Sequence, residues 1–282
     1  MSVTERSDKQ SFGHEAISSH ITGIENLYSR SNIKIHRGHQ LFSLLSDATD
    51  VASEWAKENI AGTDMNKFFS TLHIERIYSA IKLLESEKNK DKYLKDLLNG
   101  SLDFFNRNIS HAKSILWELE AFTKIKKVIP GTVLDEPDVV VNINQLSIAL
   151  PCKKIFSENG VPKVLSNSVS QIEKRHDFGI VAMNIDNLIP EGVLLKAKKF
   201  QEAGDKLHAR NMEFLGRHER HFLKYLSSSR IVAVLASTSV VTDILEERPK
   251  FNNFSQWAIW TIPGLESEHA MAINEFRSQV IG

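Results

Sequence analysis

The spacing of the apolar residues changes near Lys127, and this change limits the folds that the chain can adopt. Before Lys127, apolar residues recur at intervals of three and four, the spacing of one face of an α-helix. Clear examples are Ile17, Ile21, Ile24 and Leu27, and then Ile74, Ile77, Ile81 and Leu84. After Lys127, short runs rich in β-branched residues alternate with helical patterns. We therefore predict a helical region followed by an α/β domain.

We place the boundary so that residues 1–109 form an all-helical N-terminal region and residues 110–282 form the α/β domain. The last of four helical stripes in the first region runs from Leu94 to Phe105. In the second region the pattern predicts helices at 110–127, 161–174 and 191–226, and strands at 138–143, 146–155, 179–185, 230–237 and 256–261. This order predicts a mixed sheet flanked by helices.

Charge and cysteine content exclude several classes of protein. The 282 residues include 35 basic and 35 acidic residues, so the whole surface is not a nucleic-acid-binding surface, although a local basic patch is compatible with this balance. A single cysteine, Cys152, excludes an internal disulfide framework and a multi-cysteine zinc site. The N-terminus lacks the apolar core of a secretory signal, and the longest apolar run, 231–241, is about half the ~20 residues that a membrane span needs. We therefore expect a soluble cytoplasmic protein with no membrane contact.

Two acidic residues, Glu118 and Asp138, occupy positions that make them candidates for a functional site. In the helix expected at 110–127, Glu118 falls on the apolar stripe, whereas Glu120 points away from it. A carboxylate on a core-facing stripe is costly unless it is paired or bound to a metal, and the alternative is a glutamate at the edge of the stripe that reaches solvent. Asp138 follows Pro137 at the start of a strand, where its side chain can project past the end of the sheet. The same pattern is also an ordinary turn into a strand.

The strand expected at 146–155 contains a lysine near its end. Alternation places Cys152 on the apolar face, as an inert core thiol, and Pro151 and Lys153 on the other face. Lys153 is either a solvated residue that protects the sheet edge or a catalytic ammonium group. In the helix that follows, Gln171 lies on the side that could reach the end of the sheet.

The order of these residues resembles the PD-(D/E)XK nuclease superfamily, and its restriction-endonuclease-like members in particular. The resemblance covers about residues 115–188, roughly a quarter of the chain. It implies a mixed sheet flanked by helices and a metal-dependent endonuclease that acts on DNA in prokaryotic restriction or phage defence. It also implies Mg²⁺ or Mn²⁺ as the cofactor, held by Glu118 and Asp138. Lys153 would then be the cation beside the scissile phosphate, and Gln171 a group that orients water.

The chain departs from the family pattern at Pro151, where the family has an acid two residues before the lysine. One explanation is a site that uses Glu118 and Asp138, with a backbone carbonyl completing the metal shell. A second is that another acid takes the missing position; the candidates are Asp135, Glu136 and Glu158. The third is a catalytically inactive module that binds nucleic acid or a partner protein. The N-terminal helices could serve as a docking surface for a partner or for a second copy of the chain.

Overall fold

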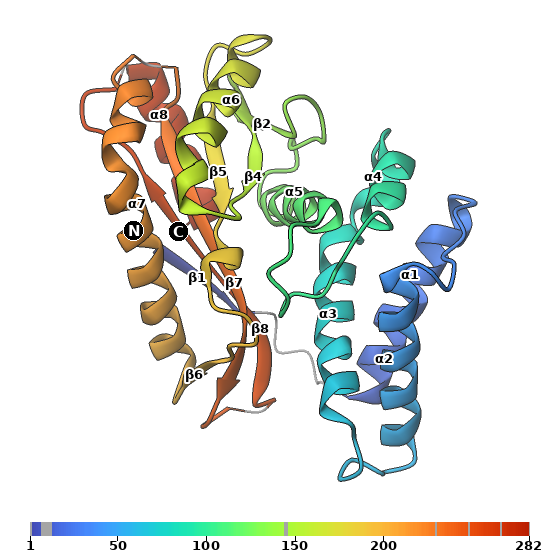
Figure 1. Cartoon of the computed structure of the whole chain (residues 1–282). Coiled ribbons are helices and arrows are strands. Elements are labelled where there is room, and N and C mark those ends of the chain that lie inside the picture. Colours follow the sequence, from blue (N-terminus) through green and yellow to red (C-terminus); the bar gives the residue numbers. More distant parts are fainter. Residues whose placement is uncertain are drawn as a thin grey trace.

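The computed structural model describes residues 2–6, 13–143, 146–228, 230–247, 249–265 and 267–281. It is a mixed α/β arrangement in which a group of N-terminal helices packs beside a sheet (Figure 1). Helix α5 (His111–Lys126) lies between them and contacts α3 (Met65–Ile81) on one side and the strand β4 (Cys152–Lys154) on the other. The prediction of an α/β protein with a helical N-terminal region is confirmed.

The N-terminal helices are α1 (His14–Arg30), α2 (Gln40–Ala56), α3 and α4 (Lys90–Leu97). A short 3-10 turn, η1 (Leu84–Ser86), joins α3 to α4. The apolar stripes predicted for α1, α2 and α3 are buried. The fourth helix was expected to continue to Phe105, but it ends at Leu97. Gly100 has a φ of 123°, a conformation open to glycine that an α-helix cannot contain.

The larger sheet has the strand order β1-β8-β7-β5-β4. Its strands are β1 (Ser2–Arg6), β4, β5 (Ile180–Asn184), β7 (Ala233–Ile244) and β8 (Phe251–Trp260), and β6 (Leu195–Ala197) also pairs with β7. Strands β4, β5 and β7 run parallel to one another. Strand β8 pairs antiparallel with β7, and β1 pairs antiparallel with β8. Residues 1–109 were predicted to be all helical, but Ser2–Arg6 form the strand β1. It pairs along the edge of β8, where backbone N–H and C=O groups otherwise lack partners.

A smaller antiparallel pair joins β2 (Val139–Ile143) to β3 (Leu146–Leu150). The single strand expected at 146–155 is divided at Pro151, which has no N–H to donate to a neighbouring strand. Before Pro151 the chain pairs with β2, and after it β4 pairs with β5. Cys152 is buried, as the alternation predicted.

Helix α6 (Val161–Glu173), preceded by the 3-10 turn η2 (Glu158–Gly160), connects β4 to β5. Helix α7 (Phe200–Leu226) was expected to begin at 191 but begins at Phe200, because the 3-10 turn η3 (Asp186–Leu188) and the strand β6 come first. Helix α8 (Ser267–Phe276) and a π-helical turn, η4 (Arg277–Ile281), end the described chain.

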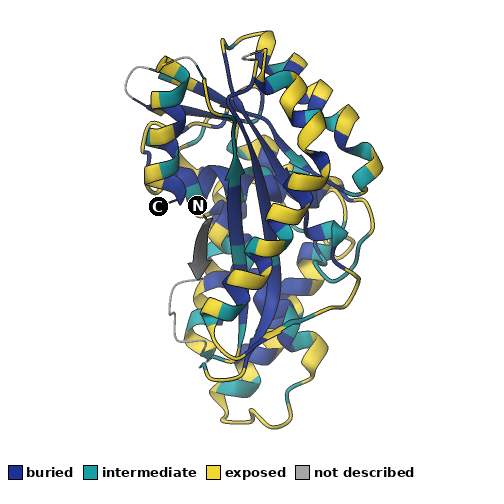
Figure 2. Ribbon diagram, turned by 90° about the vertical axis from the view of Figure 1, so that its left-hand side faces the viewer, coloured by how far each residue is buried: buried dark blue, intermediate teal, exposed yellow. Residues whose placement is uncertain are grey.

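The core continues from the N-terminal helices into the sheet. One buried apolar cluster contains residues of α1, α2, α3, α5, β2, β3, β5 and β7. A second cluster lies between the opposite face of the sheet and helices α6 and α7. Figure 2 shows the strands buried and the outer faces of the covering helices exposed. Within the described ranges, no helix has both the length and the apolar character needed to cross a membrane.

Candidate active site

The fold brings together three of the four residues that the sequence suggested as a site. Asp138 directly precedes β2, and the pairing of Val139 with Leu150 places it beside the junction of β3 and β4. Lys153 donates a hydrogen bond from Nζ to Asp138 Oδ2 at 2.7 Å. The backbone N–H of Cys152 donates to the same oxygen, also at 2.7 Å. Asp138 is therefore fixed by two donors from β4.

Glu118 reaches this pair from α5, and its charge is coupled to theirs. Burial, and then the negative charge of Asp138, raise the pKa of Glu118 well above its usual range, while Lys153 opposes the rise. Burial also raises the pKa of Asp138, but the Lys153 ammonium and the Cys152 N–H counteract it. Burial thus raises the pKa of both carboxyls, and the positive charge of Lys153 opposes the rise at each of them.

Tyr93, on α4, is a member of this cluster that sequence reasoning missed. Burial raises the pKa of its phenol, and the nearby carboxylates of Glu118 and Asp138 raise it further. The phenol therefore stays protonated and can donate a hydrogen bond. In the sequence, Tyr93 precedes Leu94 on a helical stripe and reads as a core residue. Only the packing of α4 on α5 reveals its neighbours.

The structure does not bring Gln171 to the cluster. Gln171 is half-buried on α6, and its Oε1 is buried without a hydrogen-bond partner among the described residues. In that part of the chain no hydrogen bond joins it to Glu118, Asp138 or Lys153. The helical pattern predicted its side of α6 but could not predict where α6 would lie against the sheet.

The alternative acids have different surroundings. Glu158 pairs with Arg217 at 2.7 Å and with His218 at 3.3 Å on α7, so it is held in another contact. Asp135 is exposed and accepts a hydrogen bond from the N–H of Glu136. Glu136 is exposed as well, but its charge contributes to the raised pKa of Asp138, which places it in the neighbourhood of the site.

Within the described residues, no group of three or more His, Cys, Asp or Glu side chains has an arrangement that could hold a metal ion. Glu118 and Asp138 nevertheless supply two carboxylates, and Mg²⁺ characteristically uses one or two protein carboxylates and keeps several waters. Two buried acids with raised pKa values are also a site that a divalent cation would stabilise. Glu118 and Asp138 are therefore the residues that would supply protein ligands to Mg²⁺ or Mn²⁺.

A second buried charge cluster lies on the other side of α5. Arg76, on α3, makes a bidentate contact with Glu120 and donates from Nη2 to Asp186 at 2.9 Å. Asp186 also lies 3.5 Å from the ammonium of Lys154 and accepts from the N–H of Ser239 at 2.6 Å. Sequence reasoning missed this cluster, because its members come from four separate elements and share no spacing.

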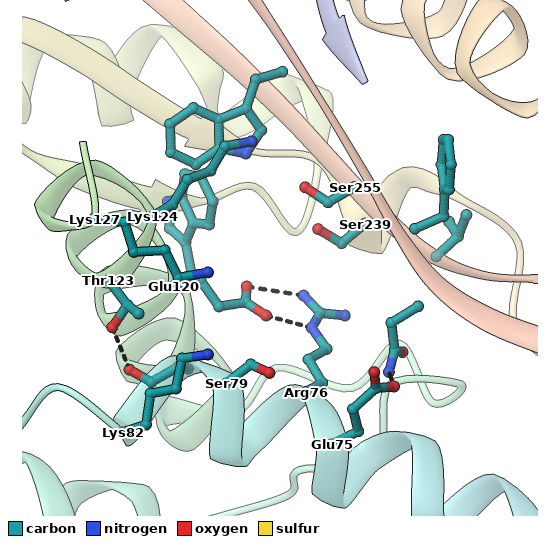
Figure 3. Close-up of a pocket in the computed structure, with 16 residues that line it drawn as sticks. Glu75, Arg76, Ser79, Lys82, Glu120, Thr123, Lys124, Lys127, Ser239 and Ser255 are labelled. Carbon is teal, nitrogen blue, oxygen red and sulfur yellow. Dashed lines mark hydrogen bonds and ion pairs between the residues drawn. The ribbon is translucent and has the colours of Figure 1, made fainter. Parts of the chain in front are cut away.

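No protein-family model, curated protein or solved structure matches this chain. The two charge clusters are therefore the features of the molecule that point to a function. The first combines two buried acids of raised pKa with a partly exposed lysine that is paired with one of them, a combination found at catalytic sites. The second is largely neutralised internally and forms one wall of a cavity (Figure 3).

Proposed function

We propose that this chain is a metal-dependent endonuclease-like protein that acts on DNA through a variant PD-(D/E)XK site. The observation that carries the proposal is the 2.7 Å contact of Lys153 with Asp138, with Glu118 on α5 near enough for the charges of both residues to shift its pKa. The resemblance predicted these residue types in this order, and a chance likeness in sequence would not require them to meet.

The order of elements around the site supports the same proposal. Helix α5 carries Glu118, Asp138 directly precedes the β2–β3 pair, and β4 carries Lys153. Helix α6 then crosses to β5, which is parallel to β4. We infer that this segment is a restriction-endonuclease-like sheet in which Pro151 divides the strand that bears the lysine.

In this proposal Glu118 and Asp138 hold the metal. When bound, Mg²⁺ or Mn²⁺ would polarise the phosphate and lower the pKa of a coordinated water. Lys153 is paired with Asp138 and has 23% of its side chain exposed, and in this proposal its ammonium group is the cation beside the phosphate. Tyr93 holds its phenolic proton and can donate to an oxygen in the site.

Pro151 and the pairing of Lys153 with Asp138 favour a second candidate, in which the same fold binds nucleic acid or a partner protein without cutting. In both cases the setting we propose is prokaryotic restriction or phage defence. A homodimer or partner complex formed through α1 and α2 is compatible with either, since these helices lie at the far side of the molecule from α7 (Figure 1).

The test is cleavage of plasmid, single-stranded DNA and RNA in Mg²⁺ or Mn²⁺ by the full chain and by Asp138→Asn and Lys153→Ala. The asparagine can still accept a hydrogen bond from the Cys152 N–H, so the junction of β3 and β4 should remain folded. We expect cleavage of DNA that EDTA abolishes and that each substitution lowers by at least about 100-fold, the scale on which charge stabilisation and positioning act.

Asp177→Asn and Lys174→Ala are matched controls, because both residues are exposed outside the cluster. They should cut like the wild type. If the wild type leaves every substrate intact, or if Asp138→Asn and Lys153→Ala cut as well as the controls, the catalytic proposal is wrong. Retained binding of DNA would then select the inactive binding module.

A further inference from the structure

A cavity of about 220 Å³ lies between helices α3 and α5 and the strands β7 and β8. We call it the α3–α5 pocket. It lies on the side of α5 that carries Glu120, about 200° around the helix from Glu118 at 100° per residue, so it is separate from the candidate active site. Figure 3 shows polar side chains from both helices and from the sheet pointing into one space.

The pocket is rich in positive charge. Four basic residues and two acidic residues line it; the basic ones are Arg76, Lys82, Lys124 and Lys127, and the acidic ones Glu75 and Glu120. Glu120 is neutralised by its bidentate contact with Arg76. The remaining charge is positive, which favours an anionic ligand.

Several hydrogen-bond donors in the pocket are left without partners. Among the described residues no hydrogen bond is recorded for the hydroxyls of Ser79, Ser239 and Ser255, for the ammonium of Lys127 or for Nη1 of Arg76. These groups come from α3, α5, β7 and β8, so they surround the cavity. Figure 3 shows the two strand serines pointing from the sheet into the space that the Arg76–Glu120 pair also borders.

We propose that the α3–α5 pocket binds a small ligand that carries a phosphate group, as free phosphate or as a phosphate monoester. An oxyanion accepts several hydrogen bonds at once, and bonds in which one partner is charged are about twice as strong as neutral ones. The unpartnered hydroxyls and N–H groups match that need. The volume of the cavity suits a small molecule better than a polymer, which separates this site from the DNA-binding surface of the proposed function.

Arg76 is held in position for this role. Its guanidinium lies 4.2 Å from the centre of the Phe104 ring and is fixed by Glu120 and Asp186. A cation that is already oriented loses little freedom when it binds an anion. Arg76 thus contributes a fixed donor at the base of the pocket, while Lys127 lies at its exposed rim.

The test is calorimetric titration and thermal unfolding of the full chain with inorganic phosphate and with AMP, at constant ionic strength. Adenosine is the uncharged control. We expect saturable binding with a Kd below about 1 mM and a matching rise in Tm for at least one of the two anions, and no binding of adenosine. Tighter binding of AMP than of phosphate would identify a monoester, and the reverse order would identify free phosphate.

Lys127→Gln and Ser255→Ala should each weaken binding by about fivefold or more, because each removes a donor to a charged acceptor. Lys57→Gln, an exposed lysine at the end of α2, is the control and should bind like the wild type. The proposal is overturned if neither anion binds saturably at millimolar concentration, if adenosine binds as well as AMP, or if both pocket variants bind unchanged. Because no cleavage is measured, this outcome is independent of the nuclease proposal.

Discussion

The buried carboxyl groups of this protein differ in how completely their charge is compensated. Burial opposes the ionisation of Asp186, but Lys154 and Arg76 hold its pKa below the ordinary value. Glu118 and Glu75 lack such compensation, and burial raises the pKa of each. Asp186 therefore stabilises the fold as an anion, whereas the other two favour the neutral form. Ionisation of either residue therefore costs stability, which is typical of groups retained for a site.

Glu75 provides a prediction about pH. Burial raises its pKa from 4.5 to about 7, while a hydrogen bond from Asn253 opposes the rise. A carboxyl with a raised folded-state pKa contributes stability that is fully present below about pH 4.5 and is lost as the pH rises through about 7. At 1.36 kcal/mol for each pH unit between these values, the loss amounts to about 3 kcal/mol.

Glu75→Gln keeps an acceptor for Asn253 and removes the titration. We expect the variant to match the wild type near pH 5 and to exceed its free energy of unfolding by up to about 3 kcal/mol at pH 8.5. The measurement is urea unfolding across that range, with the exposed Glu219→Gln as control. Parallel pH curves for Glu75→Gln and wild type would show that Glu75 does not titrate as described. The charged groups that face Glu75 across the pocket are Arg76, Lys82, Glu120, Lys124 and Lys127.

At the scale of elements, local pattern predicted the helices and strands that pack by one face. The stripes of α1, α2 and α3 are buried as their spacing predicted, and β5 is a short apolar run that is buried along its whole length. The errors lie where the chain direction is decided by contacts distant in sequence. The start of α7 was predicted too early, because β6 forms only by pairing with β7. The end of α4 is an exception, because Gly100, whose φ is 123°, lies only a few residues after Leu97.

The residues of the two charge clusters also separate into those that local sequence patterns predicted and those that they could not predict. Glu118, Asp138 and Lys153 could be predicted, since each has a local peculiarity: an acid on an apolar stripe, an acid after proline at a strand start, and a lysine at a strand end. Arg76 and Asp186 have no such local signal. Their pairing joins α3 to the end of β5, and a distance of 110 residues along the chain leaves no trace in spacing.

The junction of β3 and β4 yields a prediction at Pro151. A carboxylate introduced there would share a strand face with Lys153 and lie across from Asp138, where the family pattern has its acid. We expect Pro151→Glu to increase Mn²⁺ affinity about tenfold relative to Pro151→Ala. Without metal it should lower the free energy of unfolding by about 1–3 kcal/mol, because a third acid joins two whose pKa values are already raised.

The measurement is thermal unfolding of both variants with and without MnCl₂. The alanine variant controls for loss of the proline ring and for the restored N–H. Equal stabilisation of the two variants by Mn²⁺ would mean that residue 151 does not face the metal position. The resemblance to the family site would then not include the position of the missing acid.

At the scale of the whole molecule, the Arg76 cluster joins the helical region to the sheet. Arg76 belongs to α3, Glu120 to α5, and Asp186 follows β5. Both partners of Arg76 have little exposed side chain, 17% for Glu120 and 5% for Asp186. Removal of the cation leaves buried charge uncompensated, which typically costs about 3–5 kcal/mol. Arg76→Met should therefore destabilise the protein by that amount and loosen the contact of α3 with the sheet.

Arg217 is a matched control, since it also pairs with two carboxylates, Glu158 and Glu213, but is 44% exposed. Exposed ion pairs contribute about 0–1 kcal/mol, so Arg217→Met should have little effect on unfolding. Fluorescence of Trp117 and Trp257, which lie in edge-to-face contact between α5 and β8, reports on the junction, and far-UV circular dichroism reports on the whole chain. If Arg76→Met costs no more than Arg217→Met, the cluster is not what couples the two parts. If Arg76→Met is destabilised and its unfolding curve from tryptophan fluorescence no longer coincides with the curve from circular dichroism, unfolding has ceased to be two-state. The helical region and the sheet would then fold as one unit only while this buried arginine connects them.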